Sequence, residues 1–165
     1  MVAEALFDLT GKVIVVTGGS RGLGHAMVQA FAAQGADIAV VSRKSADCEA
    51  TAADVRERFG RRAVALPTNV SDWTQCDILV EQVYNTFGRC DVLVNNAGLS
   101  PLYDSLTNVS EALFDKVIGV NLKGPFRLTA LFGERMAADG GGSILNISSV
   151  GSLRQSPDYL PYAAA

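Results

Sequence analysis

A glycine-rich segment at 17–24 (TGGSRGLG) stands directly between a β-branched run at 13–16 and a helical pattern at 22–34. Gly18 suits a tight turn, and Gly22 lacks a side chain where the backbone would approach a ligand. Gly24 would let the helix pack closely, and the helix N-terminus offers unpaired N–H groups and a partial positive charge. The segment therefore predicts a seat for a dinucleotide's pyrophosphate. A glycine-rich turn without a ligand is the alternative.

Short apolar runs alternate with longer helical patterns along the whole chain, which is typical of a parallel sheet wrapped by helices. We expect strands at 13–16, 38–41, 63–66, 92–94 and 144–147, and helices at 22–34, 46–59, 72–87 with Ser71 as N-cap, and 111–138 with Ser110 as N-cap. Pro125 should bend or break the last of these helices. A further helix begins near 159. These patterns predict an α/β, Rossmann-type doubly wound parallel sheet, incomplete at its C-terminal side, in a single domain over residues 1–165.

Composition narrows the classes of function. A net charge of −3 gives no electrostatic reason to expect nucleic acid or anionic lipid as a partner. No apolar run approaches the roughly 18–20 residues that span a bilayer, and the N-terminus does not resemble a signal peptide. His25 and three scattered cysteines form no metal-ligand pattern, so we expect no metal site, no disulfide framework and a cytoplasmic location.

Three further motifs follow the glycine turn in order. They are Asn95-Asn96-Ala97-Gly98 after the fourth predicted strand, Val120-Asn121-Leu122 in the long helix, and Ile147-Ser148-Ser149 followed by the opening of YxxxK at Tyr162. With TGxxxGxG, this series resembles the short-chain dehydrogenase/reductase family along the whole chain. The resemblance implies an NAD(P)-binding oxidoreductase acting on CH–OH groups, in which the NNAG segment braces the sheet behind the cofactor. The implied cofactor contacts in the glycine turn are Gly18, Ser20, Arg21, Gly22, Leu23 and Gly24. In the NNAG segment they are Asn95, Ala97 and Gly98.

The end of the second predicted strand favours NADP over NAD. NAD-binding enzymes generally place a carboxylate there for the ribose 2′-OH, whereas this chain has Ser42 followed by Arg43. A guanidinium suits a 2′-phosphate, and in the family a basic residue in the glycine turn, here Arg21, supplies a second charge. Asp37 begins the same strand, too far from the ribose. Asn69-Val70 stands where the family commonly has Asp-Val at the adenine, and an asparagine can both donate to and accept from the ring edge.

The resemblance also implies the catalytic residues. Tyr162 would be the acid/base and Ser149, thirteen residues earlier, would hold the substrate oxygen, while Asn121 would steady a proton-relay water with a lysine. Ser148 is expected on the opposite face of the strand. The family's lysine would fall at position 166, beyond Ala165. We therefore expect a fragment of a longer enzyme, and little or no turnover from these 165 residues alone.

Several alternatives stay open. The start of the chain and its glycine turn are similar to those of gluconate 5-dehydrogenases and 3-oxoacyl-carrier-protein reductases, so the alcohol or ketone substrate is a sugar acid, a thioester-linked ketone or another small molecule. A non-catalytic NADP-binding module or scaffold is the competing function. A methyltransferase is disfavoured, because nothing in that class requires NNAG or the serine–tyrosine pair. The full-length protein is expected to form homo-oligomers, as family members often do.

Overall fold

The computed structural model describes residues 7–165. Five parallel strands form one sheet in the order β3-β2-β1-β4-β5. Their bounds are β1 Val13–Thr17, β2 Asp37–Ser42, β3 Ala63–Pro67, β4 Val92–Asn95 and β5 Ser143–Asn146. The chain leaves β1 toward β2 on one side and reaches β4 on the other, as in doubly wound sheets. The predicted fold class is confirmed.

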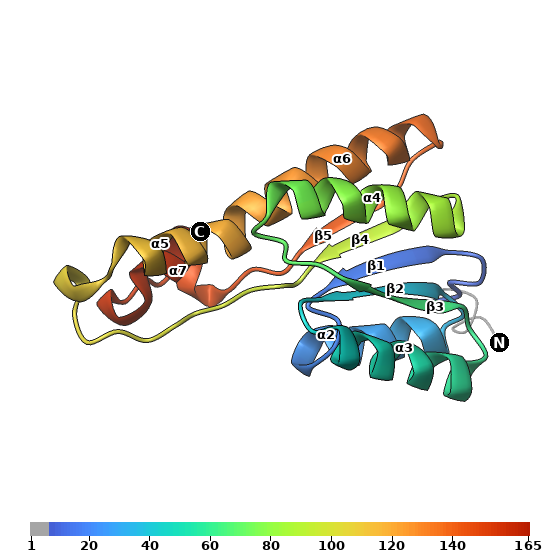
Figure 1. Ribbon diagram of the computed structural model, residues 1–165, viewed down its shortest axis with the longest axis horizontal. Coiled ribbons are helices and arrows are strands. Elements are labelled where there is room, and N and C mark those ends of the chain that lie inside the picture. Colours follow the sequence, from blue (N-terminus) through green and yellow to red (C-terminus); the bar gives the residue numbers. More distant parts are fainter. Residues whose placement is uncertain (1–6) are drawn as a thin grey trace.

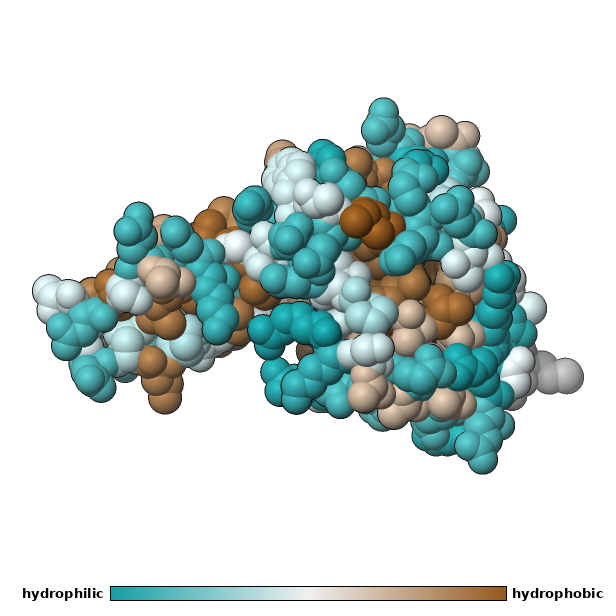
Figure 2. All heavy atoms as spheres, viewed as in Figure 1, coloured by the Kyte–Doolittle hydropathy of each residue, from teal (hydrophilic) through white to brown (hydrophobic). Residues whose placement is uncertain are grey.

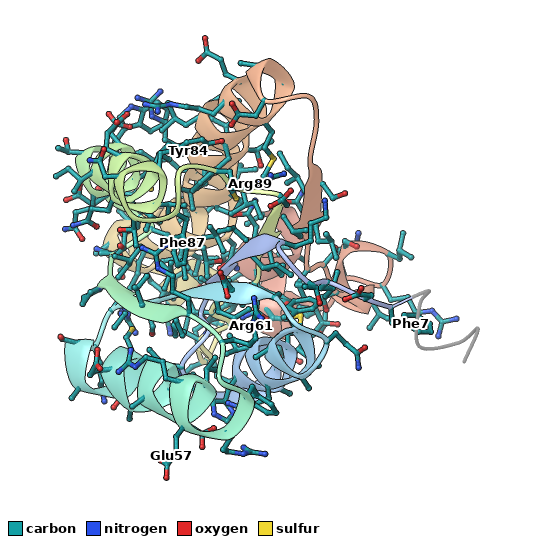
Figure 3. The ribbon with its side chains drawn as sticks, turned by 90° about the vertical axis from the view of Figure 1, so that its right-hand side faces the viewer. Phe7, Glu57, Arg61, Tyr84, Phe87 and Arg89 are labelled. Atoms are coloured by element: carbon teal, nitrogen blue, oxygen red, sulfur yellow. The ribbon has the colours of Figure 1, made fainter. Side chains whose placement is uncertain are left out.

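Helices cover both faces of the sheet (Figure 1). One layer contains α2 and α3, and the other contains α4 and α6; Figure 3 shows Glu57 on the α3 side and Tyr84 and Phe87 on the α4 side. The helix bounds are α2 Gly22–Ala33, α3 Ser45–Phe59, α4 Trp73–Phe87, α5 Glu111–Ile118, α6 Gly124–Ala138 and α7 Leu160–Ala164. Short 3-10 turns lie at η1 Leu106–Asn108, η3 Val150–Ser152 and η4 Pro157–Tyr159, and a π-helical turn at η2 Gly119–Lys123.

The continuous β-branched run of β1 is explained by burial on both faces. Ile14 and Val16 pack toward α2 and α3 with Val28. Val15 points the opposite way, into the core shared with α4 and α6, where Phe132 is fully buried. Because each face of the strand meets a helical layer, successive residues must all be apolar.

Three local expectations differ from the structure. Asp72, not Ser71, is the N-cap of α4, because its side chain accepts a hydrogen bond from the Gln75 N–H. The predicted helix 111–138 is two helices joined by the π-helical turn η2, so the break lies upstream of Pro125, which is in the first turn of α6. Ser110 caps α5 as predicted. Strand β5 ends at Asn146, so Ser148 and Ser149 lie beyond it and strand alternation does not orient them.

The amino end of the sheet is held by a buried carboxylate. Asp91 accepts hydrogen bonds from the Val13 N–H at 2.9 Å and from Arg89 Nε at 2.9 Å, and Lys12 Nζ lies 3.4 Å away. Burial alone would raise the pKa of Asp91, but these hydrogen bonds and cations outweigh it and hold the pKa below its ordinary value. Asp91 thereby ties the start of β1 to the start of β4.

Residues 99–118 and 147–165 extend away from the sheet and are called the arm below. The arm contains α5 and α7, which contact each other, and it projects from the carboxyl end of β4 and β5 (Figure 1). Apolar residues reach its surface (Figure 2). Leu102 and Leu153 of the arm are both exposed. Over residues 7–165, no helix is both long enough and apolar enough to cross a bilayer.

Candidate functional site

A cleft of about 370 Å³ opens at the carboxyl ends of the strands, where β1 lies between β2 and β4. Open α/β sheets bind their ligands at this switch point. The lining comes from the turn after β1, the ends of β2 and β3, the NNAG segment and η2. Its members are Gly18, Ser20, Arg21, Gly22, Leu23, Gly24, Val41, Ser42, Arg43, Lys44, Asp47, Thr68, Asn69, Val70, Asn96, Ala97, Gly98, Leu99 and Val120.

The glycines of the first turn provide left-handed backbone conformations and a close backbone approach. Gly18 has φ +66° and Gly22 has φ +54°, a left-handed conformation that favours glycine, and the space beside the Gly22 Cα is open. Gly24 is held at close approach, since a Cβ there would lie 2.2 Å from the Gly18 carbonyl oxygen. Arg21, the N-cap of α2, makes no side-chain cap hydrogen bond. The helix N-terminus therefore presents its N–H groups to the cleft, as a phosphate seat requires.

Thr17 and Asn96 lock the glycine turn onto the end of β4. The Thr17 hydroxyl accepts hydrogen bonds from the N–H groups of Asn96 (2.9 Å) and Ala97 (3.0 Å) and donates to the Val94 carbonyl. Asn96 Nδ2 donates to the Thr17 carbonyl at 2.8 Å. The sequence motifs predict that the NNAG segment braces the sheet, but they assign no contact to the Thr17 or Asn96 side chain. These bonds fix the floor of the cleft before any ligand arrives.

The β2 end of the cleft is positively charged. Arg43 and Lys44 line it with Arg21 from the glycine turn, and all three are exposed. Asp47, in the first turn of α3, also lines it and offsets part of this charge. Asp37 begins β2 as expected and pairs with Arg61 at 2.9 Å, away from the cleft. The region thus offers cations where an NAD-binding site would offer a carboxylate.

Asn69 and Val70 lie in the cleft with their orientation fixed by neighbours. Asn69 Oδ1 accepts from the Ser71 N–H (3.3 Å) and the Ser71 hydroxyl (2.9 Å). The Cys76 thiol donates to the Val70 carbonyl at 3.3 Å, and burial raises the pKa of that thiol to about 11. A protonated thiol is the form that can donate, so this support persists at neutral pH.

Asn121 lies in the π-helical turn η2, and its side chain reaches the NNAG loop. Its Oδ1 accepts from the Leu99 N–H at 3.0 Å, and its Nδ2 donates to the Leu99 carbonyl at 2.9 Å. Both ends of the carboxamide are therefore engaged with one backbone residue. Because Leu99 lines the cleft, Asn121 holds the cleft wall at the point where the arm begins.

Ser149 and Tyr162 meet around Gly151. A Cβ on this buried glycine would lie 3.4 Å from Ser149 Oγ, 3.5 Å from the Tyr162 ring and 3.2 Å from the Tyr159 ring. Ser149 Oγ accepts a hydrogen bond from the Gly151 N–H at 3.1 Å, while Ser148 is exposed. The fold thus brings together the serine and tyrosine that the sequence paired.

Not every predicted site residue reaches the cleft. Asn95 is buried and absent from the lining; its Nδ2 donates instead to Asn146 Oδ1 (2.9 Å) and Thr129 Oγ1 (3.2 Å), bracing β4 against β5 and α6. The Asn95 side chain is therefore engaged with β5 and α6, and its contact with a cofactor stays a prediction. Ser149 and Tyr162 also lie outside the lining, in the arm. The remaining predicted cofactor residues line it together.

A doubly wound sheet with a helix N-terminus over its switch point is the arrangement in which dinucleotide-binding proteins hold their ligand. Comparison with protein families gives the particular family: the short chain dehydrogenase model matches residues 12–165. The chain belongs to this family of nicotinamide-dependent oxidoreductases, and the predicted resemblance is confirmed.

Individual relatives and one solved structure agree with this. The chain is 38% identical over 162 residues to a 3-oxoacyl-(acyl-carrier-protein) reductase of Thermotoga maritima, covering 95% of this chain and 63% of the relative. It is 31% identical to an NAD-dependent glycerol dehydrogenase of Listeria innocua, covering 96% and 61%. L-Sorbose reductase from Gluconobacter frateurii, solved with NADPH and L-sorbose, superposes with a TM-score of 0.91 at 29% identity, covering 96% and 60%. The chain spans about three fifths of the length of these relatives.

Proposed function

We propose that this chain carries the cofactor site and part of the catalytic site of an NADP-dependent oxidoreductase that interconverts a secondary alcohol and a ketone. The observation that carries the proposal is the cleft itself. The N-terminus of α2, with Arg21 as its N-cap residue, faces it at one end, and the cations Arg43 and Lys44 lie at the β2 end. This pairing suits a dinucleotide with an extra phosphate on its ribose.

Each group of lining residues would hold a different part of the dinucleotide. The backbone N–H groups of Ser20 to Leu23 would hold the pyrophosphate, and Arg21 and Arg43 the 2′-phosphate, with Ser42 leaving room for it. Asn69 and Val70 would hold the adenine edge, and Ala97 and Gly98 the floor beyond. When bound in its reduced form, NADPH supplies a hydride to the carbonyl carbon.

The serine–tyrosine pair would act on the substrate oxygen. Ser149 would donate a hydrogen bond to the carbonyl oxygen as negative charge develops there, and Tyr162 would donate the proton that completes the alcohol. Asn121 would keep the cleft wall and the arm in register through Leu99. In oxidation of an alcohol the proton returns to Tyr162.

The substrate class stays broad in this proposal. Relatives are named as reductases of substrates as different as L-sorbose and 3-oxoacyl-(acyl-carrier-protein). We propose a small alcohol or ketone, and a homo-oligomeric protein at full length.

Cofactor preference provides the first test. Replacing Arg43 with alanine should weaken NADPH binding roughly tenfold, because a charge-assisted hydrogen bond contributes about 1.5–3 kcal/mol and part of it is screened at an exposed site. NADH binding should change less than about twofold by the same reasoning. Arg58→Ala, at the far end of α3, is the matched control and should affect neither. Equal losses for both cofactors in calorimetry would count against the proposed 2′-phosphate contact.

Hydride transfer provides the second test and separates the enzyme from a non-catalytic module. The full-length protein, given NADPH and a panel of ketones, should reduce at least one of them. Its Tyr162→Phe and Ser149→Ala variants should lose roughly 100-fold or more in kcat with NADPH affinity retained. Tight NADPH binding without turnover of any panel member by the natural protein would favour the module.

A further inference from the structure

The Tyr103 hydroxyl joins two parts of the arm that are far apart in the sequence. It accepts a hydrogen bond from the Leu160 N–H at 2.7 Å and donates one to the Pro157 carbonyl. Tyr103 lies in the loop after β4, whereas Pro157 and Leu160 begin η4 and α7. One phenol therefore bridges the loop beside the cleft and the segment that carries Tyr162.

This contact acts as a cap supplied from outside the helix. Leu160 is the first residue of α7, and the N-cap residue, Tyr159, makes no side-chain cap hydrogen bond. The first N–H groups of any helix lack partners within it. Because α7 is only five residues long, its start has little internal support, and the Tyr103 hydroxyl satisfies the N–H two residues before Tyr162.

Tyr162 is closely packed on the side that faces Gly151. Its ring, the Tyr159 ring and Ser149 Oγ all approach Gly151 within van der Waals range of a single Cβ position. The Tyr159 hydroxyl donates a hydrogen bond to the Arg154 carbonyl at 2.9 Å. A shift in the start of α7 would therefore move the Tyr162 ring relative to Gly151, which is buried, and would change its distance from Ser149.

We propose that Tyr103 is a positioning residue for the catalytic pair: its hydroxyl fixes the start of α7 so that Tyr162 faces Ser149. Tyr103 acts through Leu160 and Pro157 and has no chemical role of its own. The inference rests on the proposed function, because it presupposes that Ser149 and Tyr162 act on substrate.

The direct test is the Tyr103→Phe variant of the full-length protein, saturated with NADPH. The variant keeps the ring and loses both hydrogen bonds, so kcat should fall roughly tenfold, as expected for a small misplacement of a reacting group. KM for substrate and the NADPH Kd should stay within about twofold, and the Leu160 amide should exchange faster with solvent. Tyr84→Phe is the matched control, since the Tyr84 hydroxyl has no hydrogen-bond partner among the described residues, and its kinetics should match those of the wild type.

A double mutant distinguishes positioning from general loosening of the arm. If Tyr103 works through the serine–tyrosine pair, Tyr103→Phe should cost at least threefold less in a Ser149→Ala background than in the wild type. Wild-type kcat in Tyr103→Phe, or an equal cost in both backgrounds, overturns the inference and leaves the proposed function standing. A wild type that binds no NADPH or turns over no ketone overturns the proposed function, and this inference with it.

Discussion

The dinucleotide half of the molecule (β1–β3 with α2 and α3) and the arm are built in different ways. In the dinucleotide half β1 and β2 are enclosed, and Val15 and Val40 have no exposed surface. In and beside the arm apolar side chains face outward, with Leu145 of β5 41% exposed and Leu153 83% exposed. The first region is fixed by close packing over a large area, whereas the second depends on a few specific contacts.

The contacts that position the arm are hydrogen bonds from side chains to backbone. Asn121 holds Leu99, and Tyr103 holds Leu160. The glycine turn is instead held by backbone surfaces at contact distance, as Gly24 and Gly18 show. A change in the dinucleotide half should therefore affect global stability, and a change in the arm should stay local.

The largest effect is expected from Gly24→Ala. A Cβ at this position would lie 2.2 Å from the Gly18 carbonyl oxygen and 2.5 Å from Asn96 Nδ2, and the backbone cannot yield without opening the turn. Overpacking typically costs about 1–3 kcal/mol of unfolding free energy, and a contact this short with backbone should cost at least the upper end of that range. NADPH binding should fall at least roughly 100-fold, since the phosphate seat is displaced. Denaturant unfolding and calorimetry measure the two losses.

Gly133→Ala is its control, because Gly133 also lies within a helix, α6, and a Cβ there would meet only Ile144 Cδ1 at 3.7 Å. Helix propensity should make this variant more stable by about 0.5–1 kcal/mol. Similar unfolding free energies for Gly24→Ala and Gly133→Ala would contradict the claim that Gly24 is required by close packing.

A smaller global effect is expected from Asp91→Ala, which removes the tie between β1 and β4. Leaving the Val13 N–H buried without its acceptor should lower the unfolding free energy by about 1–3 kcal/mol. Since the folded state holds the pKa of Asp91 below its ordinary value, the stabilisation is complete above pH ~4 and is lost as pH falls through the lower, folded value. The difference in stability between wild type and variant should therefore become smaller below that pH, although a protonated carboxyl oxygen can still accept the Val13 N–H. A constant gap in acid titrations would contradict the account.

The smallest global effect is expected from Asn121→Ala. The variant loses both hydrogen bonds to Leu99 at a partly exposed position, so the unfolding free energy should fall by only about 1 kcal/mol. The Leu99 amide should nevertheless lose most of its protection against hydrogen exchange, while amides of β1 keep theirs. Equal loss of protection in Leu99 and β1 would show that the arm and the sheet open together.

The difference between the two regions also decided what could be predicted from sequence. Strands β1 to β4, the glycine turn and the cations at the end of β2 follow from local patterns of β-branched residues, glycines and charges. The contacts of Asn121 with Leu99 and of Tyr103 with Leu160 depend on which residues meet across the fold, which spacing does not encode. The contacts of Asn95 could not be predicted for the same reason, since its partners Thr129 and Asn146 lie far along the chain. The Asp72 cap is local, but Ser71 and Asp72 are both common N-cap residues and stand next to each other, so the pattern alone does not choose between them.

The central claim is that the start of α2 seats the phosphates of a dinucleotide. A titration with NADPH, followed by the backbone amide resonances of residues 18–24, tests it most directly. The account predicts saturable binding with large shifts at Ser20, Arg21, Gly22 and Leu23, and none at Gly60, a left-handed glycine at the far end of α3. Absence of binding, or saturation that leaves these four amides unmoved, would contradict it.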